Sequence, residues 1–200
     1  MPPASISGLS RLADAAGKLK RVRRKGWVDR GVDDAESVAD HSYRLAVLAW
    51  AVARARGLDA ERAVLIALLH DLAEAEVGDE TPFDAALAEG GFDRARFDEP
   101  APRDDTRRAE KHARERAAVA GIAGALGAAL GGELQALVEA YARQRSPEAR
   151  LVKELDRVET LLQAEEYLLE RPDLPVGSFR HEVESRGLAP DLAELFRRRA

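Results

Sequence analysis

The chain has 200 residues, a net charge of −5, 46% hydrophobic and 34% charged residues, which is typical of a soluble globular protein with a sizeable core. The negative charge argues against nucleic acid as a partner, and the lack of cysteine excludes disulfides, thiolate zinc sites and cysteine nucleophiles. The longest uncharged stretch, residues 117–132, is too short to span a membrane, and no signal-like segment opens the sequence, so we expect a cytoplasmic protein with no membrane partner.

Nearly every segment has the apolar periodicity of a helix. Gly57 is a plausible end for one helix, Asp59 can cap the start of the next, and Ser146-Pro147 is a strong helix start. Gly131-Gly132 is expected to separate two helices. The predicted helices cover residues 5–24, 37–56, 60–75, 106–130, 133–145 and 146–170, with short helices around 179–186 and 191–198.

The run AVLIALL in the third predicted helix is apolar on all sides, which places that helix in the middle of the core. Residues 78–105 contain three prolines and three glycines and are expected to form a long loop with one short helix. No segment has the period of a strand. The sequence therefore predicts one all-α domain over residues 1–200, with a core of about 5–170 and a C-terminal helical extension.

The run KLKRVRRK, Lys18 to Lys25, carries six basic residues in eight. Such a run is usually a solvated helix face. It could also form an electropositive approach to a substrate that carries phosphate. An arm that binds nucleic acid is the weakest of the three interpretations, because no interleaved aromatic residues accompany it.

Two histidines and two aspartates on three predicted helices form the strongest candidate site. His41 lies near the start of one helix, His70-Asp71 at the end of the apolar run, and Asp156 between Leu155 and Val158. Each alone has an ordinary explanation, as a core histidine, a chance dipeptide or a solvated acid. Together they are a suitable ligand set for a divalent metal with open positions for water and substrate.

Acidic residues crowd the same turn. Glu74 is four residues after His70, so we expect both side chains on one helical face, and Asp79 follows on the exit loop. His112 lies in a charged helix and His181 in the polar tail, and both are predicted to be surface residues.

These motifs resemble a known family. His41, the His70-Asp71 doublet and Asp156 are similar to the H…HD…D signature of HD-domain metal-dependent phosphohydrolases. The segments KGWVDRGV…ESVADHSYRLA, LLHDLAEAEVGDETP and SPEARLVKELDRVETLLQAEEY resemble its 5'-deoxynucleotidase branch over most of residues 18 to 170. The resemblance implies an HD-type fold and hydrolysis of deoxyribonucleoside 5'-monophosphates.

The resemblance also implies roles for individual residues. The metal ligands would be His41, His70, Asp71 and Asp156, with Glu74 as the catalytic carboxylate and Asp79 as a second active-site acid. Trp27 matches a tryptophan near the sugar; some members have an arginine directly before it, where this chain has Gly26. Candidates for contact with the phosphate are Lys25, Arg30 and Lys111.

Dinuclear members of the wider family need more histidines between the doublet and the last aspartate, and only His112 lies there. We therefore expect one divalent ion, which could be Mn, Co, Zn, Ni, Fe or Mg. The resemblance implies a homodimer, and Gly121, Gly124 and Gly127 could permit close approach of two helices. Alternatives are a phosphohydrolase of another nucleotide or phosphomonoester, and a non-catalytic nucleotide-binding regulator.

Overall fold

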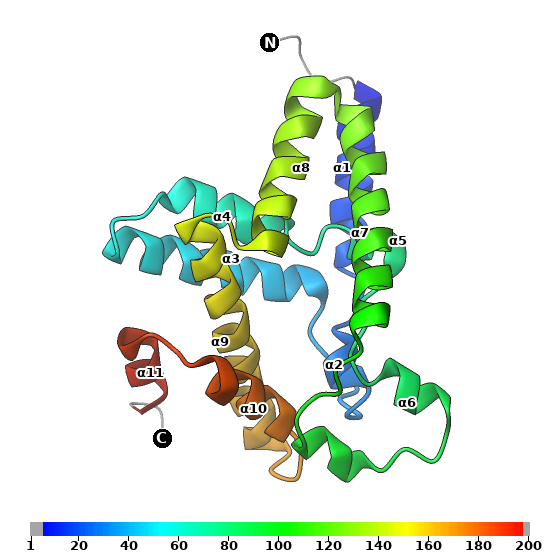
Figure 1. Cartoon of the computed structure of the whole chain (residues 1–200), viewed down its shortest axis with the longest axis vertical. Coiled ribbons are helices and arrows are strands. Elements are labelled where there is room, and N and C mark those ends of the chain that lie inside the picture. The colour runs from blue at the N-terminus through cyan, green and yellow to red at the C-terminus, as the bar shows by residue number, and fades with distance from the viewer. Residues whose placement is uncertain (1–5, 198–200) are drawn as a thin grey trace. The chain divides into compact units, whose positions relative to one another are not determined.

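The structure is a computed structural model that describes residues 6–197 (Figure 1). Ser5 and Arg198, at the outer ends of two predicted helices, lie outside this range. Within the described range the chain forms eleven α-helices and one 3₁₀-helix, with a single isolated β-bridge and no strand, so the predicted all-α class is confirmed. The described residues divide into two compact units, 6–81 with 104–153 and 82–103 with 154–197.

The first unit contains most of the helices that carry the predicted site. Its elements are α1 (Ile6–Leu19), α2 (Lys25–Val28), α3 (Val38–Ala55), α4 (Ala60–Leu69), α5 (Glu74–Val77), α7 (Asp105–Leu126), α8 (Ala128–Arg143) and the first turns of α9 (Pro147–Glu170). Its core packs α1, α3, α7 and α8 around the segment that precedes α5, through residues such as Val38, Leu72 and Ile122.

Side-chain caps fix the starts of α3 and α4, and the Asp59 cap of α4 is the one that the sequence predicts. Ser37 and Asp40 form a reciprocal capping box at the start of α3, and the Asp59 carboxylate accepts from the backbone N–H of Arg62. Gly57 follows α3 with φ +67°, a conformation that glycine adopts readily.

The predicted central helix is shorter and less enclosed than expected. It ends at Leu69 instead of Ala75. Ala63, Ile66 and Ala67 are fully buried, but Leu65 and Leu68 are about two-fifths exposed, so the prediction that it is buried on all sides is wrong. An apolar run alone does not show which of its faces meets the core.

The break between α7 and α8 occurs at Gly127, with φ +83°, and the predicted break at Gly131-Gly132 is wrong. Gly131 is helical and lies where a Cβ would be 2.1 Å from the carbonyl oxygen of Ala123. Its missing side chain therefore allows α7 and α8 to approach closely within one chain. A Cβ on Gly121 would likewise meet the Arg11 side chain of the same chain, which weakens the glycine argument for a dimer.

The second unit contains α6 (Asp84–Ala88), the 3₁₀-helix η1 (Arg94–Asp98), the rest of α9, α10 (Gly177–Arg186) and α11 (Pro190–Arg197). The segment predicted as a loop with one short helix thus holds two. Phe83, Phe92 and Phe97 pack their rings together in this segment. The Asp98 carboxylate accepts from the N–H of Gly177, which ties η1 to α10. Among the described residues, no helix has both the length and the apolar character needed to cross a membrane.

Candidate active site

A tightened turn between α4 and α5 carries the His-Asp doublet. The N–H of Leu72 donates to the carbonyl of Leu69 at 3.1 Å, and that of Glu74 donates to Asp71 at 3.0 Å. These bonds span three residues instead of the four of an α-helix. The turn buries the side chains of His70 and Glu74. His70 lies in the turn and Glu74 begins the next helix, so the two side chains do not lie on one continuous helical face, and that prediction is wrong.

The hydrogen bonds of His70 fit a metal ligand. Its Nδ1 lies 2.8 Å from the carbonyl oxygen of Ala67, and its Nε2 lies 2.9 Å from Oδ2 of Asp71. When Nδ1 donates its proton to the carbonyl, the Nε2 lone pair faces a carboxylate oxygen. Two acceptors at this distance require a proton or a cation between them. Histidines that bind metals usually donate their other ring N–H in this way.

His41, from the first turns of α3, lies beside His70. The ring centroids are 5.5 Å apart in an edge-on arrangement, and His41 is fully buried. The structure thus brings together three of the four predicted ligands, His41, His70 and Asp71. Asp156 lies on α9 in the second unit, and its place in the ligand set remains a prediction.

Positive charge surrounds the Asp71 carboxylate. Burial alone would raise its pKa, but the charge and hydrogen bond of His70, together with the charges of His41 and Arg24, hold that pKa well below its usual range. Asp71 is therefore a carboxylate ready to bind a cation.

Arg24 is a site residue that the sequence did not single out. Its Nη1 lies 3.8 Å from Oδ2 of Asp71, and its Nε lies 3.9 Å from Oε1 of Glu36. A short antiparallel pairing holds it there, because the N–H of Arg24 donates to the carbonyl of Glu36 and that of Val38 donates to Val22. Only its place in the basic run could have pointed to it.

Glu74 is buried in a region of negative charge. Burial first, and then the charges of Asp71 and Asp79, raise its pKa to about 10, although Lys111 and Arg24 work against the rise. Lys111 Nζ lies 3.9 Å from Oε1 of Glu74, and Oε2 accepts no hydrogen bond from the described residues. Without a bound cation, Glu74 therefore carries a proton at neutral pH.

Lys111 is anchored beside Glu74. Its Nζ donates to the carbonyl of Glu80 at 3.0 Å and lies 3.6 Å from Oε1 of Glu115. Burial would lower the pKa of Lys111, but the acids around it, Glu74 and Glu115 first, raise it above its ordinary value. Lys111 is therefore a fixed positive charge at the site.

Asp79 and Lys25 fix the start of α2. Oδ2 of Asp79 accepts from the backbone N–H of Lys25 at 2.7 Å. The Lys25 ammonium lies 2.8 Å from both carboxylate oxygens of Asp29. Lys25 is thus paired within the chain, and Asp79 acts here on the backbone.

Trp27 and Arg30, the other predicted substrate contacts, are buried. Trp27 Nε1 donates to Oε1 of Glu36 at 3.0 Å, and Arg30 Nη1 donates to the carbonyl of Gly26 at 2.6 Å. This burial suits a residue that only fills the core as well as one that forms a wall of a substrate pocket. Trp27 and Arg24 share the Glu36 carboxylate, so Trp27 is linked through Arg24 to Asp71.

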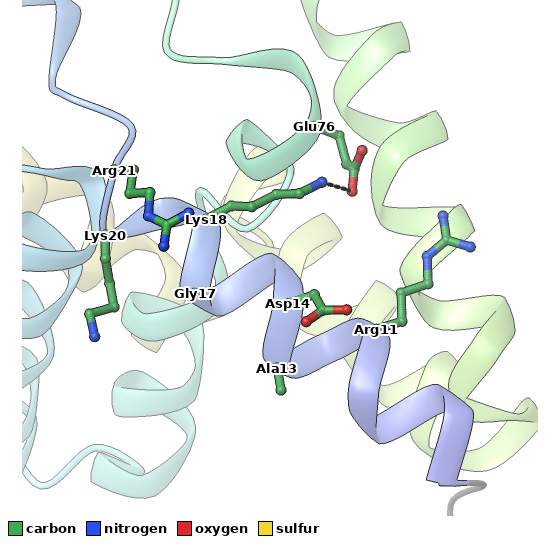
Figure 2. Close-up of a pocket in the computed structure, with 8 residues that line it drawn as sticks. All are labelled: Arg11, Ala13, Asp14, Gly17, Lys18, Lys20, Arg21 and Glu76. Carbon is green, nitrogen blue, oxygen red and sulfur yellow. Dashed lines mark hydrogen bonds and ion pairs between the residues drawn. The ribbon is translucent and has the colours of Figure 1, made fainter.

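The basic run divides between the site and the surface. Of its later members, Arg24 lies beside Asp71, and Lys25 pairs with Asp29. Its earlier members line a surface pocket of about 610 Å³ on α1, where Lys18 pairs with Glu76 at 3.0 Å (Figure 2). In Figure 2 the side chains of Arg11 and Lys20 point in different directions, so these cations do not converge on one ligand.

Tyr141 is a second residue that sequence reasoning missed. Its ring lies 4.7 Å from that of His70, and its hydroxyl accepts from Lys153 Nζ at 2.8 Å. Nothing in its position in the sequence indicates this contact. His112 and His181 are exposed, as predicted.

Comparison with known proteins identifies the family. A model described as the HD domain matches residues 16–186. The chain belongs to the HD-domain family. All the proposed ligands lie inside the matched range.

Several HD-domain relatives carry a named activity. The 5'-deoxynucleotidase HDDC2 of Mus musculus is 40% identical over 88% of this chain and 83% of its own length. The protein of the same name from Danio rerio is 42% identical, and there the chain spans 65% of the relative. A conserved hypothetical protein from Pyrococcus furiosus has a similar solved structure, with a TM-score of 0.65, 30% identity and 87% of each chain covered.

Proposed function

We propose that this chain is a metal-dependent 5'-deoxynucleotidase, which hydrolyses deoxyribonucleoside 5'-monophosphates to deoxynucleosides and phosphate. The observation that carries the proposal is the His70 Nε2 that faces the Asp71 carboxylate at 2.9 Å, with buried Glu74 in the next turn. The names of the relatives supply the reaction, and the residues of the turn supply groups that can perform it.

In this proposal His41, His70, Asp71 and Asp156 would hold one divalent ion. The donor set of two imidazoles and two carboxylates suits Mn, Co, Zn, Ni, Fe or Mg, with preference for metals that accept nitrogen. The Ala67 carbonyl orients His70, and Arg24 lies against Asp71. When bound, such an ion lowers the pKa of a water and neutralises charge on the phosphoryl oxygens.

Glu74 would move the proton. In its protonated form, which burial favours, it could protonate the leaving 5'-oxygen as a general acid. A nearby cation would favour its carboxylate, which could instead take a proton from the attacking water. Lys111 would add positive charge beside the phosphate, and Asp79 would hold α2 in place through the N–H of Lys25.

Selection of the sugar would depend on the segment around Trp27. A closely packed wall rejects an added 2'-hydroxyl that has no hydrogen-bond partner. Such apolar selection gives roughly a hundredfold at best. Since Gly26 stands where some relatives have arginine, we expect a preference for deoxyribose that is present without being absolute.

A substrate panel tests the proposal. Phosphate release would be measured for deoxyribonucleoside monophosphates, ribonucleoside monophosphates, deoxynucleoside triphosphates and simple phosphomonoesters, after chelation and with each divalent metal added back. The proposal requires deoxynucleoside monophosphates to be preferred and chelation to abolish turnover. A preference for triphosphates would identify another phosphohydrolase, and nucleotide binding without any turnover would identify a regulator.

The remaining expectations about partners also belong to this proposal. The family resemblance supports a homodimer, a small-molecule nucleotide as the substrate and a cytoplasmic location. The negative net charge supports the absence of a nucleic-acid partner.

A further inference from the structure

A tyrosine and a lysine lie behind His70, and the proposed chemistry gives neither of them a role. Tyr141, near the end of α8, packs against His70 with the ring centroids 4.7 Å apart and the ring planes at 57°. Lys153, in the second turn of α9, donates from Nζ to the Tyr141 hydroxyl at 2.8 Å, and this ammonium lies 4.7 Å from the centre of the Tyr141 ring. All three residues belong to the first unit. A row of contacts therefore leads from Lys153 through Tyr141 to a proposed metal ligand.

The tight connection between α8 and α9 brings Lys153 back to Tyr141. α8 ends at Gln144, which takes the left-handed conformation with φ 51°. The Ser146 hydroxyl then accepts from the N–H of Ala149 and caps the start of α9. The chain thus reverses between Gln144 and Ser146, so that the second turn of α9 meets the last turn of α8.

Tyr141 continues the buried face of α8. Leu134 and Leu137 are buried on this helix, and Tyr141 follows Leu137 by one helical turn. α8 packs against α4, whose C-terminal end carries His70. Tyr141 is half-buried, and an apolar side chain could fill the same space. The hydroxyl adds a polar group that packing alone does not need, and that hydroxyl is the group that Lys153 binds.

A histidine that binds a metal must hold its ring in one orientation. Productive geometry requires about 0.5 Å and 10–20° of precision. The bond between His70 Nδ1 and the carbonyl of Ala67 fixes one ring nitrogen, but the imidazole can still tilt about that bond. The rings of Tyr141 and His41, with centroids 4.7 Å and 5.5 Å from that of His70, restrict this tilt. The direction in which Nε2 points therefore depends on Tyr141.

We propose that Tyr141 and Lys153 are positioning residues for His70. The Tyr141 ring sets the tilt of the imidazole, and the Lys153 ammonium holds the Tyr141 ring in place through its hydroxyl. Partners that orient a ligand in this way govern metal affinity without touching the metal. The inference rests on the proposed function, because it takes His70 as a metal ligand, and its test measures metal binding in place of turnover.

The first measurement is the affinity of the full chain for Co²⁺, determined after chelation by competition with a chelator of known affinity. Tyr141→Leu removes the ring and should weaken binding about tenfold to a hundredfold. Tyr141→Phe keeps the ring and loses only the hydroxyl bond, so it should weaken binding about threefold to tenfold. The visible absorption of bound Co²⁺ reports the ligand geometry, and it should change in Tyr141→Leu.

A double-mutant cycle tests the role of Lys153. Lys153→Met keeps the length of the side chain and removes the same hydrogen bond that Tyr141→Phe removes, so the two variants should lose affinity by similar factors. Because one bond can be lost only once, the double variant should bind Co²⁺ about as tightly as either single variant. Losses that multiply in the double variant would overturn the link from Lys153 through Tyr141.

Leu134→Ala is the matched control for a general loss of packing. Leu134 is buried on the same face of α8, about 10 Å along the helix from Tyr141. This variant should unfold at lower urea concentration but keep the Co²⁺ affinity and spectrum of the parent. If Leu134→Ala weakens Co²⁺ binding as much as Tyr141→Leu does, the positioning role is wrong.

His70→Ala separates this inference from the proposed function. If His70→Ala binds Co²⁺ as tightly as the parent, His70 is not a ligand, and the proposed ligand set falls together with the positioning role. If His70→Ala loses Co²⁺ while Tyr141→Leu binds it as the parent does, only the positioning role is overturned. Loss in both variants, with parent-like binding in Leu134→Ala, is the expected result.

Discussion

Replacing Glu74 with glutamine should stabilise the metal-free protein at neutral pH. The ordinary pKa of the glutamate is 4.5, and burial beside Asp71 and Asp79 raises it to about 10 in the folded chain. A raised carboxyl pKa means that folding takes up a proton. The stability that this group contributes is therefore complete below pH 4.5 and is lost progressively as the pH rises toward 10.

The size of the stability difference follows from how far the working pH lies above the ordinary pKa of the glutamate. Each pH unit above 4.5 costs about 1.4 kcal/mol, so at pH 7 the parent has lost roughly 3 kcal/mol that Glu74→Gln retains. For a chain of this length that corresponds to about 6–12 °C in Tm. Glutamine has nearly the same shape and no charge, so packing is preserved.

The assay is urea unfolding in the presence of a chelator at pH 5.5, 6.5 and 7.5. The difference in free energy of unfolding between Glu74→Gln and the parent should grow with pH at about 1.4 kcal/mol per unit. Titrating groups that do not interact with Glu74 cancel in this difference. A difference that stays constant with pH, or a variant less stable than the parent at pH 7.5, would refute the argument from burial and neighbouring charge.

Three further predictions concern the ligands, the packing of glycine and the sugar. His70→Ala and Asp156→Ala should each lose metal and activity together, and full occupancy by elemental analysis would remove the residue concerned from the ligand set. Gly131→Ala should lower the free energy of unfolding in urea by several kcal/mol, because a Cβ there would lie 2.1 Å from a backbone oxygen. Gly124 has open space around it, so Gly124→Ala should raise the free energy of unfolding by about 1 kcal/mol. Equal effects of the two substitutions would contradict the close approach of α7 and α8. The ratio of kcat/KM for dAMP over AMP should be well above one in the parent and fall in Trp27→Ala, and an unchanged high ratio would assign the sugar selection to another side chain.

The sequence correctly predicted those helix ends that are determined by neighbouring residues in the chain. Ser37 and Asp59 begin helices through their own side chains, so their effect can be read without knowing the fold. The two candidate histidines, His41 and His70, were singled out by their association with apolar positions and by the family resemblance. Both arguments use only the order of residues along the chain.

The predictions from sequence were wrong or incomplete where contacts between segments distant in the sequence determine the local structure. Gly127 and Gly131 look alike in the sequence, and only the closeness of α7 at Ala123 shows which one is helical. The end of α4 at Leu69 depends on a tight turn within a run of good helix formers. Arg24 and Tyr141 reach the site through contacts across the fold, which no local pattern encodes.

The pairing of residues 22–24 with 36–38 has a consequence for how such an enzyme could diversify. Its hydrogen bonds join backbone atoms, so they hold whatever the side chains are. The stretch from Lys25 to Ala35 is therefore held at both ends by backbone bonds, while Trp27 and Arg30 inside it are buried. Its exposed positions, Val28, Asp33 and Asp34, could change with a new substrate preference, while Val38 still begins α3 at the same place and His41 keeps its position.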